Sequence, residues 1–314
     1  MTAHQFRVYG CTDTGLVREV NEDHILMGRF IKNSGAIGLE FADDDDFMSA
    51  YGLIFAVADG IGGAAAGEVA SKLALTTIER HFYGFEKQAD NTEVFQEALL
   101  AASKRANDTV MQVAGSRPEC RGMGCTLTGV CLTPSGYLVF NSGDSRVYRF
   151  RSGYLKQLTE DDTLVNIAIK AGQMSYEEAE NSDKRHTITN SIGYTDFRLN
   201  INSGPDLRVD DRLLICSDGL HDLVAIERIE EIISQSPIDQ AVTRLVDEAK
   251  TNGGHDNISI VLIKYDEILE FAEIEIILPD AEIISEPAVD EEKCVNTEEA
   301  EPIPCEVAGD DRPI

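Results

Sequence analysis

The chain has 314 residues, 43% of them hydrophobic, and a formal net charge of −29. This length allows one large domain or two small ones, each with a sizeable core. The negative charge disfavours nonspecific nucleic-acid binding and docking on anionic lipid, because both depend on clustered Lys and Arg. No apolar stretch reaches membrane-spanning length, and the polar N-terminal residues are not typical of a signal peptide. We therefore expect a cytoplasmic protein without a membrane partner.

The seven cysteines indicate a reducing compartment, because they are odd in number and lack CxxC spacing. Cys131 and Cys216 lie inside apolar runs, where a thiol serves as a small buried hydrophobe. A zinc site formed by Cys120, Cys125 and Cys131 is disfavoured, since the spacing is wrong and no histidine is near.

Short runs rich in β-branched and aromatic residues predict a series of strands. These are expected at residues 5–12, 51–58, 125–132, 137–141, 145–150, 212–217 and 257–263. Turn signals at residues 134–136 and 151–153 separate neighbouring strands. Residues 125–157 are therefore predicted to form one antiparallel meander.

Apolar residues at helical spacing predict helices at residues 66–82 and 92–113, and a third that begins at Ser236. In the third, Ser236 is expected as the N-cap, Pro237 as the first helical residue and Asp239 at the capping-box position. Its predicted buried face consists of Ile238, Ala241, Val242, Leu245 and Ala249. Grouped strands and segregated helices favour an α+β fold over alternating βαβ units.

Two internal segments are predicted as loops. Residues 32–50 contain four consecutive aspartates at 43–46, which is typical of a solvated loop. Residues 160–195 are polar, with weak helical signals at 164–171 and 176–180, and this pattern is typical of a surface flap.

The last fifty residues form a distinct acidic segment. Residues 265–314 contain 17 Asp or Glu against Lys293 and Arg312, a net charge of −15, which leaves −14 for residues 1–264. Such a composition with dispersed prolines is typical of disorder, although residues 273–278 have the pattern of an edge strand or a partner-binding segment. We expect a domain over 1–264 and a tail over 265–314 that is either autoinhibitory or docking, or a dispensable extension.

Five aspartates each lie at the end of a strand-like run, several beside glycine. They are Asp23, Asp59, Asp144, Asp218 and Asp256. Hard cations such as Mg²⁺ and Mn²⁺ prefer oxygen ligands, and carboxylates on rigid strand ends supply them at fixed separations. Taken singly, each motif indicates only a turn. Their repetition beside strands long enough to pair in one sheet favours a multi-metal centre.

The ordered series of motifs between residues 5 and 264 resembles the metal-dependent protein serine/threonine phosphatases of type 2C. The matching segments are residues 12–18, 21–23, 57–63, 124–126, 141–148, 158–159, 191–193, 216–220 and 253–258. The resemblance implies a β-sandwich of two antiparallel sheets flanked by helices on both sides, with a dinuclear Mn²⁺ or Mg²⁺ site at one end.

Position by position, the resemblance implies ligands for the two metals. These are Asp23, Asp59, the carbonyl of Gly60, Asp218 and Asp256. Glu22, acting through water, and Asn257 would lie behind these ligands. Asp144, together with Asp218, would match a third, weaker metal site of many bacterial members. Arg18 would bind the substrate phosphate.

This set implies hydrolysis of phosphoserine and phosphothreonine in proteins that a serine/threonine kinase has phosphorylated. Two cations lower the pKa of a bridging water, which yields a hydroxide that attacks phosphorus in line. Five acidic groups cannot stay ionised together without such cations. Arg18 offers a planar fork of donors to phosphate oxygens. Without the surrounding motif, an ion pair with Glu19 or Glu22 would be its default interpretation.

The chain departs from the family pattern in three places. Ile61 stands where animal members often carry a histidine that is proposed as general acid, and bacterial members usually have an apolar residue there. The sequence Asp161-Asp162-Thr163 replaces the usual Asp-His-Ser, and Cys125 replaces a common threonine. None of these changes removes a ligand, and the first indicates a bacterial-type member.

Two other classes of function stay open at this point. A catalytically silent regulator with the same fold would bind a phosphoprotein or a partner kinase, but such proteins usually lose ligands and none is missing here. A two-metal nuclease or phosphodiesterase uses similar chemistry, but the negative charge disfavours a nucleic-acid substrate. His24, His221 and His255 adjoin metal-site motifs and are assigned no role.

Overall fold

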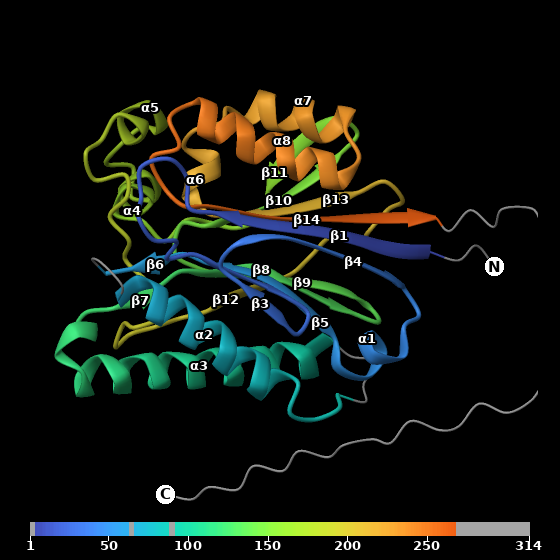
Figure 1. Cartoon of the computed structure of the whole chain (residues 1–314), viewed down its shortest axis with the longest axis horizontal. Helices are drawn as coiled ribbons and strands as arrows, with labels where there is room; N and C mark the ends of the chain where they lie inside the picture. Colours follow the sequence, from blue (N-terminus) through green and yellow to red (C-terminus); the bar gives the residue numbers. More distant parts are fainter. Residues whose placement is uncertain (1–3, 63–65, 88–91, 268–314) are drawn as a thin grey trace, which may run out of the picture. The chain divides into compact units, whose positions relative to one another are not determined.

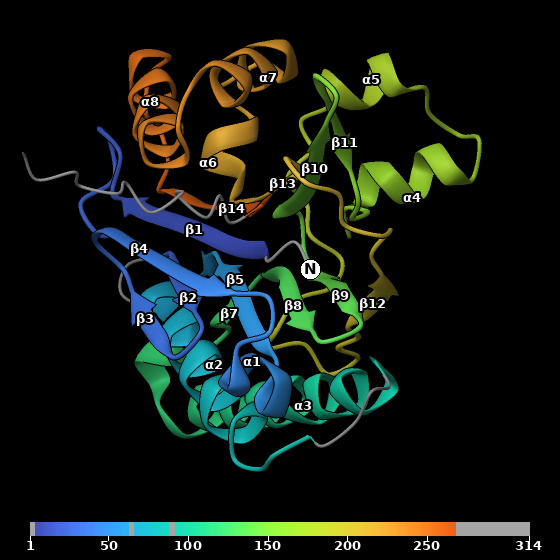
Figure 2. The same cartoon turned by 90° about the vertical axis from the view of Figure 1, so that its right-hand side faces the viewer.

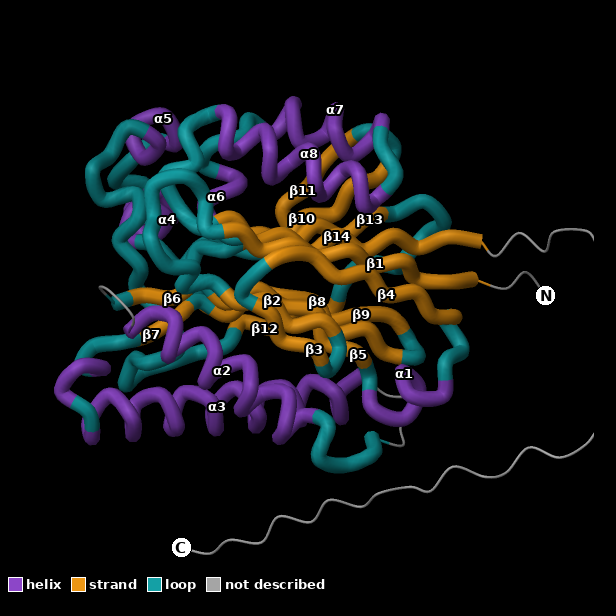
Figure 3. Tube along the Cα trace, in the orientation of Figure 1, coloured by secondary structure: helices purple, strands orange, loops and turns teal. Residues whose placement is uncertain are grey.

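The computed structural model describes residues 4–62, 66–87 and 92–267. Two six-stranded antiparallel sheets pack face to face within these residues (Figures 1 and 3). One sheet has the order β11 (Tyr154–Gln157), β10 (Arg146–Arg151), β13 (Arg212–Cys216), β14 (Ile258–Glu267), β1 (His4–Asp13), β4 (Gly35–Ala42). The other has the order β12 (Asn200–Ser203), β9 (Gly136–Ser142), β8 (Leu127–Thr133), β5 (Leu53–Ala58), β2 (His24–Met27), β3 (Phe30–Lys32). A short pair, β6 (Gly60–Ile61) with β7 (Gly124–Cys125), adjoins them.

Helices cover the outer face of each sheet, as Figures 1 and 2 show. On the β5 side lie α2 (Ala66–Phe82) and α3 (Thr92–Ser116), whose buried residues share one core with that sheet. On the β14 side lie α6 (Asp218–His221), α7 (Ile226–Gln235) and α8 (Ile238–Thr251). The predicted α+β sandwich with helices on both sides is therefore confirmed.

The inner core between the sheets explains why β5 is buried along its whole length. Side chains alternate across a strand, so Phe55 and Val57 face the inner core while Ile54 and Ala56 pack under α2. Asp59 follows directly and is thereby fixed by two packed layers.

The predicted strands are confirmed apart from a few terminal residues, but the single meander over 125–157 is wrong. β8 pairs with β9 in one sheet, and β10 pairs with β11 in the other. The chain crosses between the sheets at Gly143, whose φ of 116° strongly favours glycine. A Cβ there would lie 2.6 Å from Thr126 Cγ2. Asp144 thus sits at a crossover rather than in a hairpin turn.

The loop predicted at residues 32–50 is also wrong, because it contains β4 and α1 (Asp46–Tyr51). β4 is an edge strand whose partly buried Ile37, Leu39 and Phe41 pack against the inner core. The acidic run begins the helix: Asp45 is the N-cap, and its Oδ1 accepts a hydrogen bond from Met48 N at 2.9 Å.

The third predicted helix is confirmed as α8 with its whole predicted buried face, but its predicted start is wrong. Pro237 is the N-cap, without a side-chain cap bond in the described structure, and Ser236 ends the preceding α7. The Ser236 hydroxyl accepts a hydrogen bond from Arg244 Nη1 at 2.6 Å instead.

The flap contains both weakly predicted helices, α4 (Leu164–Lys170) and α5 (Tyr176–Glu180).

At the C-terminal end of the domain, β14 extends to Glu267, which pairs with His4. The remaining tail, including residues 273–278, lies outside the described residues. Among the described helices, none is both long and apolar enough to cross a bilayer.

Removing the Phe55 side chain should destabilise the protein strongly, because this ring is fully buried between the sheets. We expect Phe55→Ala to lower the free energy of unfolding by about 3–5 kcal/mol. Phe30→Ala removes the same atoms from a ring that is 55% exposed and should cost under about 1 kcal/mol. Urea unfolding of both variants measures the difference, and equal losses would contradict the assigned inner core.

Candidate metal centre

The five predicted aspartates gather at one end of the sandwich, at strand ends from both sheets. Asp23 precedes β2, Asp59 follows β5 and Asp144 follows β9, all in one sheet. Asp218 follows β13 and Asp256 precedes β14 in the other sheet. A direct link joins the two sheets here, because Ser217 Oγ donates a hydrogen bond to Asp23 Oδ2 at 2.9 Å.

These residues line one cavity of about 750 Å³. Of the predicted site residues, the lining includes Arg18, Glu22, Asp59, Gly60, Asp144, Asp218, Asp256 and Asn257. Asp23 is fully buried beside them. The structure therefore brings together residues far apart in sequence, such as Arg18 and Asp256, which are separated by 238 positions.

Burial and mutual repulsion keep the carboxyl groups from ionising together. Burial raises the pKa of Asp23 to about 7, and the charges of Asp218 and Asp256 add to the shift. Burial, with the charge of Asp218, raises the pKa of Asp144 to about 8. The pKa of Asp59 is also well above its usual value, through burial first and then through its acidic neighbours. Protons or cations must neutralise such a cluster.

The donor set fits hard divalent cations. Asp23 Oδ1, Asp218 Oδ1 and Glu22 Oε1 are buried and have no hydrogen-bond partner among the described residues. An unsatisfied buried acceptor costs about 1–3 kcal/mol, and more when it is charged. Carboxylate oxygens at this end of the sandwich are the ligands that Mg²⁺ and Mn²⁺ prefer. The chain's own residues therefore fit a cluster of such cations.

Arg18 lies at the rim of this cavity and contacts the acidic cluster directly. Its Nη2 donates to Asp256 Oδ2 at 2.6 Å, and its side chain is 48% exposed. The ion pair with Glu19 or Glu22 that the isolated sequence would suggest is replaced by this one. A guanidinium placed here faces both the carboxylates and solvent.

Asn257 fixes the loop that carries Arg18. Its Nδ2 donates to the carbonyls of Thr14 and Val20 at 3.0 and 3.1 Å, and its Oδ1 accepts from Glu22 N at 2.8 Å. Gly15 permits the close approach, because its φ is 78° and a Cβ would lie 2.2 Å from the carbonyl oxygen of Asp256. The amide side chain therefore fastens both ends of the Arg18 segment.

Comparison with known proteins decides the family. Residues 42–262 match the family model described as "Protein phosphatase 2C". The chain belongs to the protein phosphatase 2C family.

Relatives of this phosphatase 2C chain are bacterial. "Serine/threonine protein phosphatase PstP" of Mycobacterium tuberculosis is 33% identical over 72% of the chain, which spans only 43% of that relative's length. "Serine/threonine phosphatase stp" of Listeria monocytogenes is 30% identical over 81% of the chain and 94% of the relative. A crystal structure of the PstP catalytic domain "in complex with 2 Manganese ions" superposes with a TM-score of 0.65 at 29% identity, covering 84% and 99% of the two chains.

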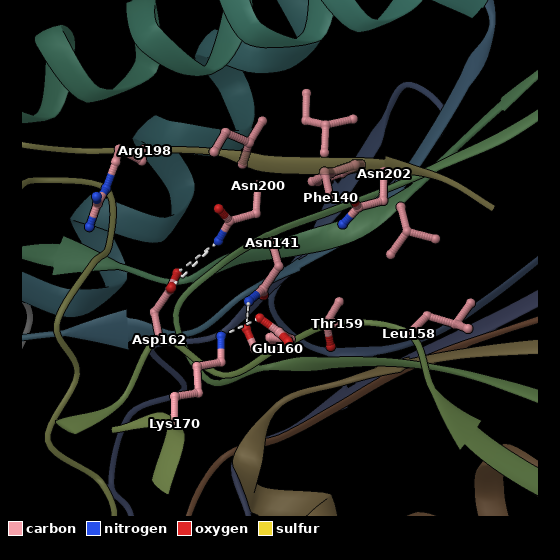
Figure 4. Close-up of a pocket in the computed structure, with 13 residues that line it drawn as sticks. Phe140, Asn141, Leu158, Thr159, Glu160, Asp162, Lys170, Arg198, Asn200 and Asn202 are labelled. Carbon is pink, nitrogen blue, oxygen red and sulfur yellow. Dashed lines mark hydrogen bonds and ion pairs between the residues drawn. The ribbon is translucent and has the colours of Figure 1, made fainter. Parts of the chain in front are cut away.

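In this phosphatase 2C chain, Asp162 supports the crossover that carries Asp144. The backbone N of Gly143 donates to Asp162 Oδ2 at 3.2 Å, and Asp162 N donates to the carbonyl of Gly143 at 2.9 Å. Asn190 Nδ2 also donates to Asp162 Oδ2 at 2.8 Å. Figure 4 shows Asp162 with Asn200 on the wall of a second cavity of about 570 Å³. The departure from the family at position 162 therefore has a structural role.

The neighbouring Asp161 holds a different part of the same segment. It accepts bonds from Arg146 Nε and Nη2 at distances down to 2.7 Å. Arg146 is thus a structural residue of β10.

Sequence reasoning missed several cavity residues, among them Arg185 and His186, which come from the flap. Of the three histidines beside metal motifs, His24 is buried with Nδ1 2.9 Å from Ser71 Oγ. His221 Nε2 lies 3.2 Å from the carbonyl of Asp144, and His255 lines the cavity. Nothing in the polar sequence around His186 signals that it reaches the aspartates.

Without divalent cations, the protein should lose stability as the pH rises. The pKa values of Asp23 and Asp144, about 7 and 8, exceed the value of about 3.9 in an unfolded chain. Between these values the folded state binds more protons, so the free energy of unfolding falls from about pH 5 to pH 8. Urea unfolding in EDTA measures this slope. Asp144→Asn should flatten it, whereas Asp108→Asn on the exposed face of α3 should leave it unchanged. An Asp144→Asn slope equal to the wild-type slope would refute the assignment.

Asp162→Ala should loosen the crossover at Asp144, because it removes the side-chain acceptor of the Gly143 amide and one of the two acceptors of Asn190 Nδ2. We expect the free energy of unfolding to drop by about 1–3 kcal/mol and the amide of Gly143 to exchange hydrogen faster. Urea unfolding and hydrogen exchange measure the two effects. Asp196→Ala, on an exposed turn directly after the flap, serves as the control, and identical exchange in both variants would count against this role.

Proposed function

We propose that this chain is a metal-dependent phosphatase that hydrolyses phosphoserine and phosphothreonine in proteins. The observation that carries the proposal is the convergence of five buried or half-buried carboxyl groups, with unpaired oxygens, beside the guanidinium of Arg18. The names of the relatives and the manganese-containing structural neighbour support it. The relatives' names favour catalysis over a silent regulator. The chain supports the same choice, because none of the predicted ligands is missing from its sequence.

The proposal assigns two cations, Mn²⁺ or Mg²⁺, to the side chains of four aspartates and the carbonyl of Gly60. The aspartates are Asp23, Asp59, Asp218 and Asp256. Bound there, the cations supply a water that ionises near neutral pH and Lewis-acid stabilisation of the phosphoryl group. Glu22, whose Oε1 is buried without a partner among the described residues, is assigned to hold a water behind the ligands.

Arg18 is assigned to hold the phosphate of the substrate. Its five donors match phosphate oxygens in pairs, and its exposure lets an incoming phosphate replace Asp256 as the acceptor. Ile61 lines the cavity where animal members often have histidine. An apolar side chain cannot donate a proton, so the leaving alkoxide takes its proton from water in this proposal.

The substrates proposed here are proteins phosphorylated by a serine/threonine kinase rather than nucleic acids. A chain with a net charge of −29 repels a polyanion, whereas a single phosphate on a protein meets Arg18 locally. The rim of the cavity adds a second cationic side chain, Arg185. Both guanidinium groups lie where a phosphorylated side chain would enter.

The purified protein should hydrolyse p-nitrophenyl phosphate and a phosphothreonine peptide when Mn²⁺ is present, and EDTA should stop both reactions. Asp59→Asn should lower turnover by about 100-fold or more, because it removes charge from the proposed ligand set. Asp44→Asn, on an exposed turn, is the matched control and should keep wild-type turnover. Circular dichroism checks that both variants are folded. Full turnover of folded Asp59→Asn would reject the site, and failure of the wild type with Mn²⁺ would reject the function.

A further inference from the structure

His186 comes from the flap and lies against two of the aspartates. Within the described residues, it forms with Asp144 and Asp218 the one set of three potential ligands whose donor atoms all lie within 4.8 Å of one another. No three of Asp23, Asp59, Asp218 and Asp256 are drawn together as closely. The three groups come from separate segments: the crossover after β9, the first residue of α6 and the flap.

The atoms of this set are not used up by other contacts. Asp218 Oδ1 is buried and has no hydrogen-bond partner among the described residues. His186 Nδ1 lies 3.4 Å from Asp222 Oδ2, which is long for an N–H···O hydrogen bond. Asp144 is only 6% exposed, so little solvent reaches its carboxylate.

We propose that His186 supplies a nitrogen ligand to a cation held with Asp144 and Asp218, so that the flap itself takes part in metal binding. This inference rests on the proposed function. Imidazole binds Mn²⁺, Co²⁺ and Zn²⁺ readily, whereas Mg²⁺ prefers oxygen ligands alone. The Asp144 site therefore selects a transition cation, while the oxygen-only centre beside it accepts Mg²⁺ as well.

The nitrogen ligand also couples cation binding to the position of the flap. The flap meets the sandwich through backbone hydrogen bonds near both of its ends. Asp162 N donates to the carbonyl of Gly143 at 2.9 Å, and the segment at Ile192 is attached by Cys125 N, which donates to the Ile192 carbonyl at 3.1 Å. His186 lies just before this attached segment. A cation shared by His186 and the aspartates adds a further link, at the rim of the cavity that receives the substrate.

His221 is another histidine beside Asp144 that could compete as a nitrogen source. His221 Nε2 is 3.2 Å from the backbone carbonyl of Asp144 rather than from its carboxylate. Its side chain is 3% exposed, with Nδ1 3.1 Å from Asp222. A test must therefore distinguish the flap nitrogen from this buried one.

Pulsed electron paramagnetic resonance on tag-free, full-length protein loaded with three equivalents of Mn²⁺ makes this distinction. The wild type should show the hyperfine coupling of a directly bound ¹⁴N, and His186→Ala should lose it. His186→Asn, which keeps a polar side chain of similar size, should lose it too. His81→Ala, on the last turn of α2, is the matched control and should keep it.

Cation titration gives the second readout. The weakest Mn²⁺ site should lose affinity by about 10–100-fold in His186→Ala, the range that ligand-supporting groups already reach, while Mg²⁺ binding should change by less than about twofold. A coupling that persists in both His186 variants assigns the nitrogen elsewhere and overturns the proposal. An absent coupling in the wild type overturns it as well. Mn²⁺-dependent phosphatase turnover is measured on the same samples, so the proposed function stands or fails separately.

Discussion

The repulsion between carboxyl groups that are buried together at one end of the sandwich is the constraint to which the surrounding structure responds. Asp23 and Asp144 are almost inaccessible to water, and burial together with their neighbours raises their pKa values. If the fold did not hold them, such carboxyl groups would move apart or turn to solvent. They do not, because each one ends or begins a strand whose register is set by the packed sheets. Folding therefore holds these carboxyl groups together at a cost in free energy, because burial opposes their ionisation.

Hydrogen bonds at Asp23 and at Asp59 hold these residues in place against the repulsion. Ser217 bridges the sheets: its hydroxyl donates to Asp23 and accepts from the backbone N of Ser259 at 3.0 Å. Asp59 is held through its own backbone, because its N donates to Thr126 Oγ1 and its carbonyl accepts from Thr126 N, both at 2.9 Å. Both aspartates are thus positioned through the main chain or a neutral hydroxyl. The second carboxylate oxygen of Asp23, Oδ1, has no hydrogen-bond partner among the described residues.

The sequence predicted the acidic centre well because its signal is local and repeated: Asp59 and Asp218 each precede glycine directly after an apolar strand. It failed where two architectures share the same local signal. The sequence around Gly143 predicts a turn, and this signal is the same whether the next strand pairs with the preceding one or crosses to the other sheet. β4 escaped notice because only alternate residues such as Leu39 pack inward and glycines interrupt its pattern. The placement of His186 depends on long-range bonds that no single segment encodes.

The aspartates and the flap are held in place in two different ways. The aspartates sit on strand ends, where a shift of one residue would move a ligand to the wrong face. The flap is fastened to that frame through Asp162, whose carboxylate accepts from Gly143, and through Ile192, which pairs with Cys125 beside Thr126. These anchors adjoin Asp144 and Asp59, so the base of the flap is joined to the same frame that holds these aspartates. Between the anchors the flap exposes apolar side chains such as Ile167 and Tyr176. Such exposed side chains can vary in sequence without moving the aspartates, because surface segments on a rigid scaffold tolerate change.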